Sequence, residues 1–308
     1  MSHQKTHNQL LPDIEKPIIF IGTGRSGTSV ITEIILRHKD LAFPSHYNEL
    51  FYKYPMISLI RNIFDNHYWR IHGEKNQLNK VKFLNKFIFR HMETYSMWEY
   101  LSGTDVDFSR DYLLNQKANT DKIKFIHAYF QKMLRYQNRK RLAFKLTGAP
   151  RIGYLLSIFP DARFIILKRD AIPTISSFLK VDFWKEKGYN QIWANGAYTE
   201  EELVIAEKIK DQPELLNALQ IRKMYEVMKM ECRIYKPNYI VVSYEDFVTK
   251  PKPEIKRIFS FLQIKEDKAC LNYLNEKKIF NRNKLDEEYF NRNQLKNIYK
   301  ILNYNFTV

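Results

Sequence analysis

The chain has 308 residues, of which 44% are hydrophobic and 15% aromatic, so it can bury a sizeable core and does not belong to the disordered class. A net charge of +16 indicates anionic partners such as a nucleotide, an acidic glycan, nucleic acid or a membrane surface, although AT-rich coding, which favours Lys, Asn and Ile, would also raise it. The two cysteines, Cys232 and Cys270, are too few for a disulfide framework and match no zinc pattern, so we expect reduced thiols and no metal site.

The N-terminal residues 1–16 form a polar tail without the apolar segment of a secretory signal. No apolar run along the chain is long enough for a transmembrane helix. We therefore expect a cytoplasmic protein whose residues 17–308 form a single domain.

Short apolar runs predict the strands of this domain. Residues 17–22 form a continuous apolar run that ends in glycine, and residues 28–38 follow with apolar side chains at helical spacing. Three further strands, each followed by a helix, are predicted at 142–146, 163–168 and 239–243, with the helices at 149–159, 170–180 and 251–263. This alternation predicts an α/β fold in which helices flank a central parallel sheet.

The glycine-rich turn Gly22-Thr-Gly-Arg-Ser-Gly-Thr-Ser29 lies between the first strand and the first helix, which is the context of a phosphate-binding loop. Gly22 and Gly27 have Walker spacing, but Thr28 stands where a Walker loop has lysine, and Arg25 is the only cation in the turn. A phosphosulfate needs a cation at its bridging oxygen and no magnesium, so this replacement favours sulfuryl over phosphoryl transfer.

The segment from Ile18 to Ser29 resembles the 5′-phosphosulfate loop of sulfotransferases that use PAPS (3′-phosphoadenosine 5′-phosphosulfate). It is most similar to the Arg-Ser-Gly-Thr branch, which includes tyrosylprotein and bacterial carbohydrate sulfotransferases. The resemblance implies the nucleotide-kinase-like fold of that family. It also implies a phosphosulfate site made by Gly24, Arg25, Ser26, Gly27, Thr28 and Ser29.

Later segments resemble the same family in the same order. Residues 159–170 are similar to its second motif, which implies that Arg169 and Ser177, eight residues later, bind the 3′-phosphate. Residues 144–150 loosely resemble a segment whose lysine contacts the sulfuryl group, which implies that role for Lys145. Residues 242–248 resemble a late, largely structural segment. The stretches 45–140 and beyond 265 match nothing in the family pattern; we interpret 45–140 as a helical insertion that walls an acceptor pocket.

The catalytic base is where the sequence departs from the family pattern. An acceptor hydroxyl must lose its proton during transfer, and the branch usually has a glutamate shortly after the first helix. His46 occupies that position here, and Glu49 lies three residues later. Both stay open, as does a residue elsewhere such as His72, His91, His127 or an acid.

Together these features predict sulfuryl transfer from PAPS to a hydroxyl of a saccharide or glycolipid, with Arg25 and Lys145 stabilising the developing charge and without a metal. A phosphoryl transferase with an atypical loop and a non-catalytic basic binding protein are the alternatives. Nucleic acid is not the expected partner, and peripheral membrane contact stays open.

Overall fold

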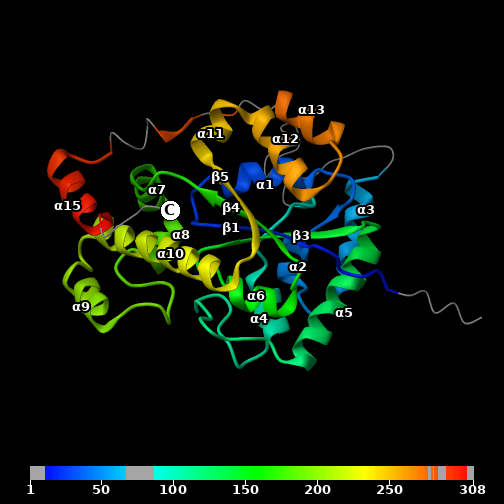
Figure 1. The fold of residues 1–308 in the computed structure, drawn as a ribbon, viewed down its shortest axis with the longest axis horizontal. Coiled ribbons are helices and arrows are strands. Elements are labelled where there is room, and N and C mark those ends of the chain that lie inside the picture. Colours follow the sequence, from blue (N-terminus) through cyan, green and yellow to red (C-terminus); the bar gives the residue numbers. More distant parts are fainter. Residues whose placement is uncertain (1–10, 67–86, 277–278, 280, 284–288, 304–308) are drawn as a thin grey trace, which may run out of the picture.

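A parallel sheet forms the centre of the molecule in the computed structural model, which describes residues 11–66, 87–276, 279, 281–283 and 289–303 (Figure 1). Its five strands run in the order β2-β3-β1-β4-β5, and every neighbouring pair is parallel. The strands are β1 (Ile18–Gly22), β2 (Leu41–Ala42), β3 (Arg141–Thr147), β4 (Arg163–Lys168) and β5 (Asn238–Ser243). The predicted α/β class with a flanked parallel sheet is confirmed. The two-residue β2 is too short to give a sequence pattern and was not predicted.

Alternating side chains of the strands build two separate cores, one on each face of the sheet. On one face Phe20 and Leu167 pack with Ile34 against three helices, α1 (Thr28–Leu36), α12 (Pro251–Leu262) and α13 (Lys268–Glu276). These helices lie together above the sheet in Figure 1, with α11 (Tyr244–Thr249) beside them.

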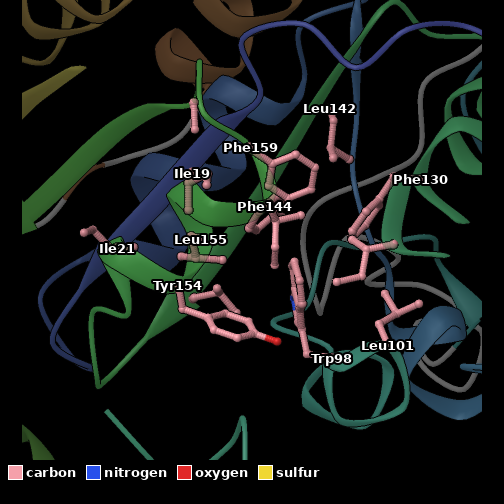
Figure 2. Close-up of a cluster of buried hydrophobic side chains, with 14 of the residues drawn as sticks. Ile19, Ile21, Trp98, Leu101, Phe130, Leu142, Phe144, Tyr154, Leu155 and Phe159 are labelled. Atoms are coloured by element: carbon pink, nitrogen blue, oxygen red, sulfur yellow. The ribbon is translucent and has the colours of Figure 1, made fainter. Parts of the chain in front are cut away.

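The other face is covered by α4 (Tyr95–Ser102), α5 (Thr120–Gln137) and α6 (Ile152–Ile158), below the sheet in Figure 1. Figure 2 shows Phe159, Phe130 and Trp98 grouped around Phe144 in this core, with Ile19 at its edge. The ring centre of Trp98 on α4 lies 4.8 Å from the ring centre of Phe108 and 5.1 Å from that of Phe144. The segment between 45 and 140 therefore contributes to the main core and is not a peripheral addition.

The start of that segment is tied to the sheet by a buried arginine. It forms α2 (His46–Leu50), the 3-10 helix η1 (Pro55–Ile60) and α3 (Arg61–Phe64). Arg61 is fully buried and donates hydrogen bonds to the carbonyl of Leu41 at 2.6 Å and to Gln137 Oε1 at 2.7 Å, while it pairs with Asp65 at 3.0 Å. A buried charge needs such partners, so these contacts fix the segment against β2 and α5.

The remaining helices gather beyond the carboxyl ends of the strands around a third apolar cluster. They are α7 (Ala171–Leu179), α8 (Asp182–Lys187), α10 (Pro213–Tyr235) and α15 (Arg292–Leu302). The helix α9 (Glu200–Lys208) packs beside them, with Ala206 against Leu216 and Leu219 of α10. α10 contacts both α7 and α15 and runs across the molecule in Figure 1. Both cysteines are free thiols, and none of the helices in the described ranges is long and apolar enough to cross a membrane.

Candidate functional site

The glycine-rich turn joins β1 to the N-terminus of α1. Gly27 is the N-cap of α1 and has a left-handed backbone with φ of 78°. A Cβ at this position would lie 2.4 Å from Cδ2 of Tyr244, so both the backbone and the contact require glycine. Ser26 is buried and its hydroxyl donates to the carbonyl of Thr23 at 2.6 Å, which shapes the turn from within.

Arg25 stands at the tip of the turn with an unusual φ of 66°. Its Nε donates to Oγ of Ser177 at 3.0 Å, and its carbonyl accepts a hydrogen bond from Nη1 of Arg169 at 2.9 Å. Three residues that the sequence assigned to one nucleotide, from the first turn, the end of β4 and α7, are thus in direct contact.

Arg169 is held from several sides. Its Nε donates to Oδ1 of Asn283 at 2.8 Å, and its guanidinium lies 4.7 Å from the centre of the Tyr244 ring. Only 4% of its surface is exposed. The guanidinium is therefore oriented by the glycine-rich turn, by α11 and by the C-terminal region.

A cavity of 290 Å³ lies against these groups. Its lining combines the turn and the start of α1 with three cationic side chains, Arg25, Arg169 and Arg282. The other lining residues are Gly27, Thr28, Ser29, Val30, Glu33, Ser177, Tyr244 and Ile279. Arginines at a helix N-terminus, at the carboxyl edge of a parallel sheet, form an arrangement suited to phosphate groups. A wider cavity of 800 Å³ opens at the opposite edge, beside Lys16, Arg163 and Asn238, away from these groups.

Glu245 connects the cavity wall to the C-terminal region. Burial by itself would raise the pKa of this carboxyl, but the hydrogen bonds from Asn283 at 2.8 Å and from the Asp170 amide at 3.1 Å outweigh it and lower the pKa below its ordinary value. Since Asn283 also accepts from Arg169, the ionised Glu245 holds Asn283 in the orientation that Arg169 needs.

Lys145 points from β3 toward the turn. Its Nζ lies 3.4 Å from Oγ of Ser29 and 3.1 Å from Oε1 of Glu93. The side chain is 9% exposed, so the ammonium is held between these two partners rather than in solvent. Thr147, two residues further along β3, donates its hydroxyl to the same Glu93 oxygen at 2.8 Å.

A second cavity of 540 Å³ lies on the other side of the turn, with Gly24 in its wall. Aromatic side chains dominate its lining, and Glu49, Glu93, Lys187 and Gln220 supply its charged and amide groups. The aromatic lining residues are Tyr95, Tyr112, Phe178, Phe183, Trp184, Trp193 and Tyr198. Trp184 and Trp193 belong to residues 182–212, which form α8 and α9 with connecting loops.

The two sequence candidates for a base occupy different surroundings. His46 is 7% exposed, its ring centre lies 4.1 Å from that of Tyr47, and it lines neither of the two cavities. Glu49 lines the 540 Å³ cavity. His127 bonds to the carbonyl of Ile158 at 2.7 Å and stacks on Phe159, and His91 packs against Phe43. His72 lies outside the described residues.

Several residues at this site were not identified from the sequence. Glu93 belongs to the stretch 45–140, which matched no family segment, and Asn283 lies beyond 265, which also matched none. Tyr244 and Glu245 lie in a segment interpreted as structural, and both support Arg169. The Tyr-Glu pair directly after a strand was the one available signal, because the carboxyl ends of parallel strands carry the site.

Comparison with known proteins identifies the family. The model of the Sulfotransferase family matches residues 17–268, most of the chain. The fold is similar to that of sulfotransferase STF9 from Mycobacterium avium, with 18% identity, a TM-score of 0.57 and coverage of 93% of this chain and 76% of that one. Sulfotransferase STF1 from Mycobacterium tuberculosis H37Rv is 12% identical with a TM-score of 0.50, covering 94% and 77%. No curated protein sequence matches significantly. With a glycine-rich turn at the carboxyl edge of its parallel sheet and a family match over most of its length, the chain belongs to the sulfotransferase family.

Proposed function

We propose that the chain transfers a sulfuryl group from PAPS to a hydroxyl of a saccharide or glycolipid. The observation that carries this proposal is the position of the turn between two cavities. Gly27, Thr28 and Ser29 line the 290 Å³ cavity, whereas Gly24 lines the 540 Å³ cavity. A donor in the first and an acceptor in the second would meet at Arg25 and Lys145.

The 290 Å³ cavity suits PAPS because three arginines, Arg25, Arg169 and Arg282, line it beside the N-terminus of α1. The turn and Arg25 would bind the phosphosulfate, while Arg169 and Ser177 would bind the 3′-phosphate. Arginine and a hydroxyl give charge-assisted hydrogen bonds to phosphate oxygens. Arg25 and Lys145 would stabilise the charge that develops on the bridging oxygen as the S–O bond breaks.

The acceptor assignment is supported by the lining of the 540 Å³ cavity. Trp184 and Trp193 offer flat apolar surfaces against which the C–H face of a sugar ring packs, and Gln220 and the two glutamates offer partners for its hydroxyls. The same aromatic lining also favours a phenolic alcohol, which is therefore the second candidate acceptor.

The test is transfer of ³⁵S from labelled PAPS to a panel of saccharides, glycolipids and phenols. We expect label on a saccharide or glycolipid, and label on phenols alone would replace that acceptor with the second candidate. Calorimetry with 3′,5′-ADP, the product of the donor, checks the nucleotide separately. Binding of 3′,5′-ADP should persist in EDTA, whereas binding of ATP that depends on magnesium would favour a phosphoryl transferase.

A further inference from the structure

Glu93 lies at the junction between the two cavities. It lines the 540 Å³ cavity, and its Oε1 is 3.1 Å from Nζ of Lys145, which in turn is 3.4 Å from Oγ of Ser29 in the 290 Å³ cavity. A single side chain, Lys145, therefore connects the phosphate-binding turn to this carboxylate.

The two oxygens of Glu93 have different surroundings. Oε1 accepts from both Lys145 and Thr147, which fixes the orientation of the carboxylate. Among the described residues, Oε2 accepts no hydrogen bond, and the side chain, which lines the 540 Å³ cavity, is 26% exposed. The carboxylate is thus anchored through one oxygen and available through the other, as a general base requires.

Glu49 lines the same cavity but is used differently. Both of its oxygens accept from Ser96 in the first turn of α4, from the hydroxyl at 2.7 Å and from the amide at 3.1 Å. The N-cap residue Thr94 has a left-handed backbone and makes no side-chain cap, so Glu49 satisfies donors that the helix itself leaves open. A negative charge at a helix N-terminus is stabilising, and this contact holds the segment that carries Glu93.

The other groups near the cavity are less suited to accept a proton. The ring of His46 is buried outside both cavities. Burial and the nearby Glu93 carboxylate raise the pKa of Tyr95 to about 12, and its hydroxyl donates to the carbonyl of Thr147 at 2.5 Å. Tyr95 therefore remains protonated at neutral pH.

We propose that Glu93 is the general base of the reaction and that Glu49 is a positioning residue that holds the Glu93 segment in place. The proposal rests on the function proposed above. The proton of the acceptor hydroxyl moves to Oε2 of Glu93 as the acceptor oxygen forms a bond to sulfur. The bond between sulfur and the bridging oxygen breaks, and its electron pair leaves with 3′,5′-ADP. Glu93 then returns its proton to solvent.

The experiment compares amide and alanine replacements at both positions. A base needs a carboxylate, so Glu93→Gln should lower the rate of sulfuryl transfer by about 100-fold or more. Glu49 accepts hydrogen bonds from Ser96 at the N-terminus of α4, and this role needs only an acceptor oxygen. Glu49→Gln should therefore keep most of the activity, whereas Glu49→Ala should lose it. The rate is measured with the acceptor found in the panel and, without acceptor, as release of labelled sulfate to water. Glu207→Gln, an exposed carboxylate of α9, is the control.

Binding of 3′,5′-ADP shows that each variant is folded, and we expect Glu93→Gln to bind it as wild type does. Added formate should restore part of the activity of Glu93→Ala, because a small carboxylate can enter the vacated space, and it should not restore Glu49→Ala.

A Glu93→Gln enzyme as fast as wild type would overturn the assignment and leave the proposed function intact. Loss of transfer in Glu49→Gln or His46→Gln, with Glu93→Gln active, would move the base to that residue. A wild-type protein that neither binds 3′,5′-ADP nor consumes PAPS would contradict both proposals.

Discussion

Nε of Arg169 donates a hydrogen bond to Oδ1 of Asn283 at 2.8 Å, which joins the end of β4 to a residue 114 positions later in the chain. Asn283 in turn donates to Glu245, so two side chains in series orient the arginine. The proposed 3′-phosphate site is therefore completed by the C-terminal part of the protein, beyond the residues that the family model matches.

Arg169→Ala should weaken binding of 3′,5′-ADP by about 10–100-fold, because a charge-assisted hydrogen bond to a phosphate contributes about 1.5–3 kcal/mol. Asn283→Ala removes only the support of the guanidinium and should weaken binding by a smaller factor. Calorimetry measures both affinities, with Arg233→Ala on the exposed side of α10 as the control. Unchanged binding by Arg169→Ala would exclude this arginine from the nucleotide site.

The lowered pKa of Glu245 predicts how stability depends on pH at this site. Since the folded-state pKa lies below the unfolded value of about 4.3, the contribution of Glu245 is fully present above that value and is lost as pH falls through the folded-state pKa. Glu245→Gln has no such titration. We expect the stability difference between wild type and Glu245→Gln to shrink from pH 6 toward pH 3. Urea unfolding at several pH values measures it, and a constant difference would contradict the prediction.

Gly27→Ala should both destabilise the protein and weaken binding of 3′,5′-ADP. The added Cβ meets the Tyr244 ring at 2.4 Å, and the left-handed backbone adds about 1–2 kcal/mol. Gly196→Ala is a matched control, because Gly196 has φ of 84° and no heavy atom within 4 Å of the added carbon. Thermal unfolding should show a larger loss at Gly27, and only Gly27→Ala should change the affinity.

The sheet could be predicted because its central strands β3, β1 and β4 are buried on both faces. Residues 18–22 and 164–167 are continuous apolar runs, and each is followed by a helix, so the sequence pattern alone predicted that both are strands of a parallel sheet. The contact of Arg25 with Ser177 also follows from that topology, because both lie at the carboxyl edge.

The support of the site could not be predicted because it depends on contacts between distant segments. Nothing local to Asn283 indicates that it meets Arg169, and nothing local to Glu93 indicates that it pairs with Lys145. His46 stands where the family branch usually has its glutamate, and this position made it a candidate base. Its burial beside Tyr47 is a property of the fold and has no signal in the local sequence.

The aromatic core below the sheet should contribute strongly to stability, because Trp98 of α4 packs against Phe144 of β3 in its interior. This side chain is fully buried, and its ring plane makes an angle of 8° with the stacked ring of Phe108. Trp98 also lies next to Phe130 and Phe144 (Figure 2). Trp98→Ala should lower the free energy of unfolding by about 3–5 kcal/mol, since a large cavity forms where the packing cannot close. Phe125→Ala is the control; this residue is 43% exposed on α5 and should cost much less. Urea unfolding provides both values.

Trp98→Ala should also affect the reaction, because α4 directly follows the segment that carries Glu93. We expect it to reduce sulfuryl transfer more than it reduces binding of 3′,5′-ADP. Equal losses in both would show that the damage spreads across the whole sheet.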